Sequence, residues 1–127
     1  MLMFQPKPNT IIMCSFDGFI EPEMVKKRPV IVIQKNKHNP KLVTIVPIST
    51  TEPHNISDLH VPIVGPLDGQ PAWVKCDMIT TVCLDRLDRL KLKEGNRFIW
   101  GTKNLDEDTF TLVCKGVAKH LSLDHNE

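Results

Sequence analysis

The stretch that decides the fold is Arg28–Gln34, which reads RPVIVIQ. Its Val and Ile residues fill the length of one strand, and a run without polar alternation indicates a strand buried on both faces. Pro29 cannot donate to a neighbouring strand, so we expect it at the start of this strand. A polar turn, Asn36–Pro40, then leads into a second apolar run, Leu42–Ser49. Two such strands with so short a connection predict an antiparallel hairpin at the centre of a sheet.

Further short strands are expected on both sides of this hairpin. Apolar runs bounded by Gly, Pro and Asp predict them at Thr10–Phe16, His60–Val64, Trp73–Val82 and Leu87–Lys93. The third of these runs is long enough to form a bent strand or a pair of strands. The last alternates leucine with basic residues, which is the pattern of a half-buried edge strand.

Beyond Leu105 the period of the apolar residues changes from that of a strand to that of a helix. One helical face is formed by Phe110, Val113, Cys114, Val117 and Leu121. Asn104 or Asp106 can cap this helix, and Gly116 inside it indicates a close approach to the sheet. Short strands followed by one amphipathic helix predict a mainly β fold, a small barrel with the helix packed on it. An open antiparallel sheet with the same helix is the alternative.

The composition is that of an ordinary globular protein. Of the 127 residues, 41% are hydrophobic and 24% are charged, so we expect a single domain over residues 1–127 that holds its core without disulfides or metal. No apolar run approaches the roughly 20 residues that span a bilayer. The first ten residues lack the basic start and long apolar stretch of a signal peptide. We therefore expect a cytoplasmic protein without membrane contact, whose four cysteines are reduced and buried.

The net charge of +1 is unevenly spread along the chain. Residues 1–50 carry seven basic and three acidic side chains, whereas residues 51–70 and 101–127 are net acidic. This distribution excludes a globally basic nucleic-acid binder but allows a local basic face. Aromatic residues make up 6% of the chain and Tyr is absent, so little material is available for stacking on bases.

The chain lacks the signatures of several enzyme classes. It has no G-x-S-x-G, H-E-x-x-H, Walker or G-x-G-x-x-G motif, and its histidines show no metal-ligand spacing. What stands out instead is polar residues at strand ends: Arg28 opens one strand, and Ser49 and Thr50 close the next. Lys75 and Asp77 lie two apart within an apolar run, so we expect them on the same face of a strand. Buried charges are costly alone, so these two must pair with each other or with another group.

Four segments, in order, resemble the PemK/MazF toxins of type II toxin–antitoxin systems. They are the opening strand Thr10–Phe16, then KKRPVIVI at 26–33, VPIST at 46–50 and WVKCD at 73–77, followed by the C-terminal helix. The second is similar to the family's Arg-Pro before an apolar strand, and the third to its Val-Pro-x-Thr/Ser-Thr/Ser. The fourth resembles the Val-Arg-Cys-Asp of the Kid branch. The match extends over almost the whole chain.

The resemblance implies an SH3-like barrel, a homodimer and an endoribonuclease that cleaves single-stranded RNA such as mRNA, without metal or cofactor. It also implies inhibition by a cognate antitoxin protein. Arg28 falls on the family's arginine that stabilises charge on the phosphate, and Ser49 falls where a catalytic Thr is usual. Lys75 falls on an arginine of the Kid branch, and Asp77 on its proposed general base.

Four further residues are expected to contact RNA. The resemblance places Thr50 at a second RNA-contacting hydroxyl of Kid-like toxins. Lys26 and Lys27 add positive charge that would attract both RNA and an acidic antitoxin segment. His60 is included because it opens a strand, whereas most of the other histidines lie in polar turns or at the chain's end.

The chain departs from the family pattern at two places that bear on the chemistry. The loop Asp17–Val25 lacks the Gly-rich stretch and the His of Kid-like toxins. Lys75 lacks the planar fork with which Arg holds a phosphate. A carboxylate at Asp77 can take the proton of the RNA 2′-OH and Arg28 can neutralise the phosphorus oxygens, while either Lys75 or Arg28 must serve as the general acid.

Two other functions stay open. A gyrase-poisoning toxin of the CcdB type would share the fold but acts through an apolar, Trp-containing C-terminal tip, whereas this chain ends Asp124–Glu127. A passive RNA-binding barrel would need exposed aromatics. For the homodimer, the apolar edge around Leu87–Leu92 is the surface that a second copy would cover.

Overall fold

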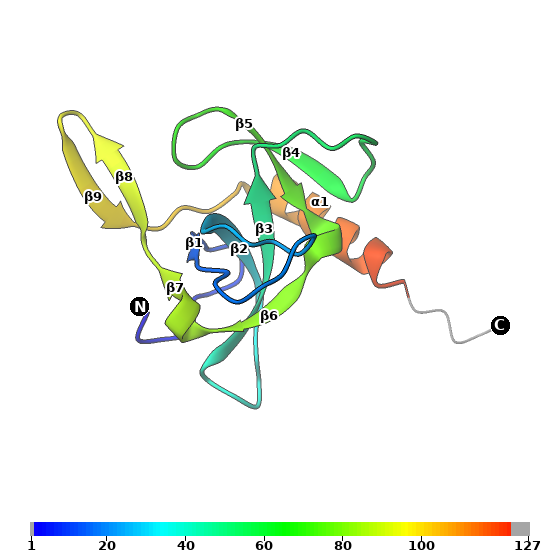
Figure 1. Ribbon diagram of the computed structural model, residues 1–127, viewed down its shortest axis with the longest axis horizontal. Helices are drawn as coiled ribbons and strands as arrows, with labels where there is room; N and C mark the ends of the chain where they lie inside the picture. The colour runs from blue at the N-terminus through cyan, green and yellow to red at the C-terminus, as the bar shows by residue number, and fades with distance from the viewer. Residues whose placement is uncertain (1, 123–127) are drawn as a thin grey trace.

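The computed structural model describes residues 2–122, and this part of the chain is mainly β with one C-terminal helix (Figure 1). The strands are β1 (Ile11–Cys14), β2 (Arg28–Lys35), β3 (Leu42–Ser49), β4 (His60–Val64), β5 (Pro71–Lys75), β6 (Thr80–Cys83), β7 (Leu87–Asp88), β8 (Leu90–Glu94) and β9 (Arg97–Gly101). Two 3-10 turns, η1 (Cys76–Met78) and η2 (Leu84–Arg86), interrupt the second half of the chain, and helix α1 is Glu107–His120. None of the described helices is long and apolar enough to cross a membrane.

The predicted central hairpin is confirmed: β2 and β3 are antiparallel, with Val30 opposite Pro47 and Val32 opposite Ile45. The main sheet runs in the order β4-β5-β3-β2-β1-β7, and β6 pairs with β3 off this path. β3 therefore lies at the centre of the molecule (Figure 1), with β6 along its first half and β5 at its end. The strand order does not return to its start, so the mainly β fold with its helix is confirmed but a closed barrel is not.

The sheet has a core on each of its two sides, which explains the uninterrupted apolar run of β2. Val30 and Val32 belong to one cluster, together with Phe16 of the loop after β1. Ile31 points to the other side and joins a second cluster that includes Val113 of α1. All three β2 residues are fully buried, as a central strand requires.

Helix α1 begins and packs as its sequence predicts. Asp106 is the N-cap, and its carboxylate accepts a hydrogen bond from the backbone N–H of Thr109 at 3.0 Å. The helix packs against η1 and β4. Val113 and Val117 are buried there, whereas Leu121 lies just past the end of the helix and is 47% exposed.

The prediction of one edge strand at Leu87–Lys93 is wrong. This segment divides into β7, which pairs with β1, and β8, which pairs with β9 in a separate two-stranded hairpin. Leu87 and Leu90 are buried in the protein's own core, so they offer no apolar edge to a second copy. β9 was not anticipated, although Gly95-Asn96 between two strand-like runs is a two-residue hairpin connection and Gly95 has φ +61°. The acidic end Asp124–Glu127 lies outside the described residues.

Candidate active site

The ends of β2 and β3 bring five of the predicted residues to one end of the sheet. Because the two strands are antiparallel, Arg28 at the start of β2 and Ser49 at the end of β3 lie at the same end of the sheet. Lys27, Arg28 and Thr50 line a hollow of about 110 Å³, and residues 65–68 form part of its wall. Lys26 is exposed just before them. This end of the sheet therefore carries a cluster of positive charge beside hydroxyl groups, and Asp68 adds one acidic side chain to the same hollow.

Arg28 is equipped to hold an anion. Its Nε is buried and has no hydrogen-bond partner among the described residues. A buried donor left unpaired costs about 1–3 kcal/mol, and a phosphate oxygen would remove that cost while meeting the permanent guanidinium charge. Ser49 is 4% exposed, and its Oγ accepts from the backbone N–H of Thr51 at 3.1 Å. The Ser49 hydroxyl hydrogen is still available to an acceptor.

A second group lies on the strands beside β3. Lys75 at the end of β5 is opposite His60 at the start of β4, and Trp73 is opposite Ser49. Residues that pair across antiparallel strands, and residues two apart on one strand, point to the same face. Val74 points to the other face, where it packs with α1 in the second core cluster. Ser49, Lys75 and His60 therefore share the face that is turned away from α1.

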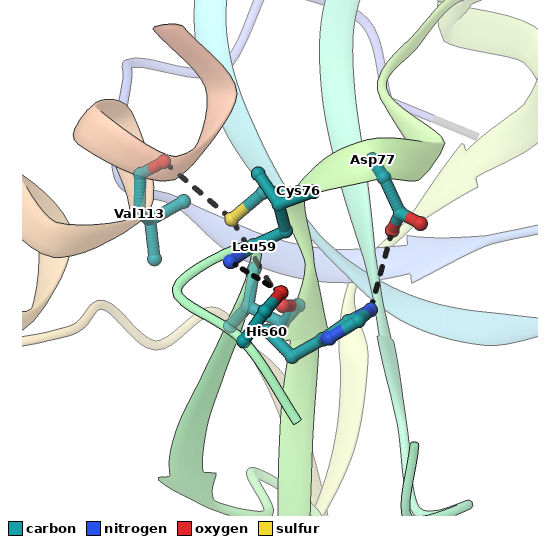
Figure 2. Close-up of polar contacts among 7 residues, drawn as sticks. Leu59, His60, Cys76, Asp77 and Val113 are labelled. Atoms are coloured by element: carbon teal, nitrogen blue, oxygen red, sulfur yellow. Dashed lines mark hydrogen bonds and ion pairs between the residues drawn. The ribbon is translucent and has the colours of Figure 1, made fainter. Parts of the chain in front are cut away.

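Asp77 approaches His60 and not Lys75. The expectation that Lys75 and Asp77 lie on one strand is wrong, because the backbone turns at Lys75 (φ −91°, ψ 83°) and Asp77 lies in η1. No ion pair joins these two residues within the described chain; instead, Asp77 Oδ1 is 3.7 Å from His60 Nε2 (Figure 2). The His60 side chain is 14% exposed and that of Asp77 is 38% exposed. His60 Nδ1 is buried and has no partner among residues 2–122.

Cys76 holds the His60–Asp77 pair in place (Figure 2). Its backbone N–H donates to the carbonyl of Leu59 at 2.9 Å, and its thiol donates to the carbonyl of Val113 at 3.5 Å. Burial, reinforced by the nearby charge of Asp77, raises the pKa of the Cys76 thiol to about 11. The thiol is therefore protonated near neutral pH, so it serves as a hydrogen-bond donor and is a poor nucleophile.

The helix can come this close to Cys76 because residue 116 is glycine. A Cβ at Gly116 would lie 2.8 Å from Cys76 Sγ and 3.0 Å from the carbonyl oxygen of Asp58. The close approach that Gly116 indicated is thus confirmed, and it is made to η1 and to the segment before β4. The helix, η1 and β4 therefore pack tightly against one another next to His60 and Asp77.

Asp77 lines a different hollow from Arg28. This hollow measures about 350 Å³ and is walled by the segment after β1, including Phe19, Glu23 and Met24. The loop that departs from the family pattern therefore shares this hollow with Asp77. Within residues 2–122, no three His, Cys, Asp or Glu side chains are grouped closely enough to hold a metal ion.

Comparison with known proteins identifies the family. The family model of the PemK-like, MazF-like toxin of type II toxin–antitoxin systems matches residues 7–121. A putative uncharacterized protein of Escherichia coli K12, YifN, is 31% identical over 72% of this chain and 78% of its own length. An uncharacterized protein of Haemophilus influenzae is 30% identical over 86% of this chain and 78% of its own.

Solved toxin structures share the fold. MazF from Deinococcus radiodurans superposes with a TM-score of 0.68 at 15% identity, over 93% of this chain and 97% of that one. The Mycobacterium tuberculosis toxin MazF-mt6 gives 0.60 at 24% identity, over 90% and 97%. An endoribonuclease in complex with its cognate antitoxin, from a mycobacterial species, gives 0.63 at 19% identity, over 94% and 98%. The chain belongs to the PemK-like, MazF-like toxin family of type II toxin–antitoxin systems.

Proposed function

We propose that this protein is the toxin of a toxin–antitoxin pair and cleaves single-stranded RNA without a metal ion. The observation that carries this proposal is the buried Nε of Arg28, which has no partner within residues 2–122, at the same end of the sheet as the Ser49 hydroxyl. His60 and Asp77 add a proton-transfer pair beside Lys75. These groups supply the donors, the charge and the base that RNA cleavage requires.

The RNA provides its own nucleophile. Its 2′-OH attacks the adjacent phosphorus while the Asp77 carboxylate takes the hydroxyl proton. The oxygens of the phosphorane then accept hydrogen bonds from the Arg28 guanidinium and the Ser49 hydroxyl. Breakage of the bond to the 5′-oxygen leaves a 2′,3′-cyclic phosphate and a 5′-OH, the latter protonated by a cationic group of the site, for which Lys75 is our candidate.

We propose two roles for His60: the RNA contact expected from its position in the sequence, and a role in positioning Asp77. It lies beside Lys75 on the strand ladder, where it can contact RNA as expected. Its 3.7 Å approach to Asp77 also gives it a positioning role, because an imidazole beside a carboxylate can orient it. Lys26, Lys27 and Thr50 are exposed next to Arg28 and would contact the phosphates and sugars of the bound strand.

We further propose a cytoplasmic homodimer that is inhibited by an acidic antitoxin segment. The related mycobacterial endoribonuclease was solved with its cognate antitoxin. Lys26, Lys27 and Arg28 would attract such a segment to the groove that takes RNA. The inhibition should weaken as salt rises, because exposed charges are screened over about 8 Å at 0.15 M ionic strength.

The decisive experiment incubates an unstructured mRNA with the purified protein in excess EDTA. We expect unimpaired cleavage and fragments that carry 5′-OH and 2′,3′-cyclic phosphate ends. An Arg28→Ala preparation, purified in parallel, separates this activity from a contaminating nuclease because it should lose nearly all cleavage. Equal cleavage by both preparations, or none by the wild-type protein, would contradict the proposed ribonuclease.

A further inference from the structure

The β8–β9 hairpin has two unlike faces. Its register places Lys91 opposite Trp100 and Lys93 opposite Phe98, so these four side chains project to one side. The pair formed by Leu92 and Ile99 projects to the other side, where Leu92 packs against the core cluster near α1. One face thus anchors the hairpin at its base. The other face is basic and aromatic, on a ribbon that extends away from the body of the protein (Figure 1).

Two exposed aromatic rings, Phe98 and Trp100, lie on this outer face. Of the chain's seven aromatic residues, all within residues 2–122, three are largely exposed: Phe4 at 59%, Phe98 at 58% and Trp100 at 60%. Lys91 Nζ lies 4.5 Å from the centre of the Phe98 ring. Although the sequence has few aromatic residues, aromatic rings and lysines therefore lie side by side on the outer face of the hairpin.

The same surface continues past the base of the hairpin. Arg89 and Thr102, which flank β8 and β9, line a hollow of about 180 Å³ together with Phe4 and Lys7. We name the whole surface the basic–aromatic band; its members are Phe4, Lys7, Arg89, Lys91, Lys93, Phe98 and Trp100. It contains four cationic side chains, and the acidic residue of β8, Glu94, is opposite Arg97 on the other face.

We propose that the basic–aromatic band binds single-stranded RNA outside the candidate active site. Every base has a π-face that can stack on an exposed aromatic ring, and Lys and Arg beside the rings neutralise the phosphates. Lys91 and Lys93 are two residues apart, as are Phe98 and Trp100, so similar base and phosphate contacts recur about 7 Å apart along the ribbon. Consecutive nucleotides would use consecutive pairs. The choice of RNA as the ligand rests on the ribonuclease function proposed above.

The charge of the band argues for a polyanion over a second copy of the chain. In a symmetric dimer this surface would face itself, bringing two sets of four cations together. RNA presents the complementary charge on every nucleotide. Bound there, the strand outside the catalytic groove would be held in place, so loss of the band should raise KM for a long RNA and leave kcat unchanged.

Binding can be measured independently of cleavage. The probe is a fluorescein-labelled 2′-O-methyl oligouridylate, which lacks the attacking 2′-OH, and the readout is fluorescence anisotropy. We expect Trp100→Ala and Phe98→Ala each to raise Kd at least about fivefold, the lower end of what loss of one stacked ring costs. Lys93→Ala should reduce the dependence of log K on log salt by about one.

Two matched controls separate the band from general effects. Arg97→Ala removes one charge from the opposite face of the same hairpin, and Leu112→Ala removes an apolar side chain that is 54% exposed on α1. Both should bind the probe within about twofold of wild type. A Trp100→Ala protein that is folded and binds like these controls would overturn the proposal.

Three further outcomes are decisive. If Trp100→Ala converts a dimer into a monomer in sedimentation with probe binding unchanged, the surface belongs to a second copy and the proposal fails. The proposal also fails if Trp100→Ala abolishes binding to a protein partner while binding of the probe is unchanged. If the wild-type protein cleaves no RNA yet binds the probe through Trp100, the ribonuclease fails and the band stands. If it cleaves RNA but binds the probe equally well without Trp100, the ribonuclease stands and the band fails.

Discussion

Asp77 lies next to residues fixed in the core of the protein, whereas Trp100 lies on the outer face of a hairpin that extends from it. Cys76, next to Asp77, is fully buried and hydrogen-bonded to both Leu59 and α1. Trp100 is 60% exposed, and within residues 2–122 its strand pairs only with β8. Side chains fixed by a core can be placed precisely enough for catalysis, while side chains on an isolated ribbon can adapt to a flexible ligand. Changes that disturb the packing around Asp77 should therefore spread through the fold, whereas changes at the second region should stay local.

A large effect is expected from removing the arginine of the candidate active site. Arg28→Ala should lower the cleavage rate by about 10²–10³-fold, the usual cost of losing one group that stabilises an oxyanion. Arg28→Lys should not restore full activity, because the planar fork is lost. Single-turnover rates measure the effect, and a melting curve checks the fold. An Arg28→Lys protein as fast as wild type would remove the need for a guanidinium.

A smaller loss is expected when Asp77 keeps its carboxylate but loses its neighbour. His60→Gln should lower the rate by about 10²-fold, the low end for a proton-transfer group. The informative readout compares kcat with KM, because a group that assists Asp77 in the chemical step lowers kcat, whereas a group that only contacts RNA raises KM. We expect the loss in kcat. A loss confined to KM would show that His60 contacts RNA without assisting Asp77.

The two regions should also differ in how much a substitution changes the free energy of unfolding. Gly116→Ala should lower the free energy of unfolding by about 1–3 kcal/mol, because the added Cβ overpacks against Cys76. The control is Thr111→Ala, an exposed position of the same helix, where better helix propensity should stabilise by a few tenths of a kcal/mol. Urea unfolding measures both variants. A stabilised Gly116→Ala protein would mean that α1 does not approach η1 this closely.

The smallest effect is expected on the hairpin. Trp100→Ala removes a large side chain, yet it should change the free energy of unfolding by no more than about 0.5 kcal/mol because the ring is exposed. The same urea experiment checks this. A loss as large as that of Gly116→Ala would place Trp100 in a core or an interface and break the contrast with Asp77.

The sequence predicts best what local patterns control. The buried run of β2, its pairing with β3 and the apolar face of α1 are confirmed because each depends on periodicity within one segment. The proximity of Arg28 to the end of β3 follows from the same hairpin. These predictions need no knowledge of the rest of the fold.

Two features depend on tertiary geometry or on a signal that was overlooked. The contact of Asp77 with His60 arises because the chain turns at Lys75 into η1, and no pattern in WVKCD reveals that turn. The β8–β9 hairpin is indicated by Gly95-Asn96 between two strand-like runs. The alternation of leucine and basic residues that ends at Lys93 predicts a single edge strand instead. The low aromatic content predicts little stacking on bases, because composition measures how many rings the chain has and not where they lie in the fold.

The central claim is that Asp77 acts as the base of a ribonuclease, and Asp77→Asn tests it most directly. Asparagine keeps the size of the side chain but cannot take the 2′-OH proton. We predict a cleavage rate about 10²–10⁴-fold lower, with melting temperature and affinity for the 2′-O-methyl oligouridylate close to wild type. A folded Asp77→Asn protein that cleaves RNA at the wild-type rate, or one that loses stability while each folded molecule cleaves normally, would contradict the claim.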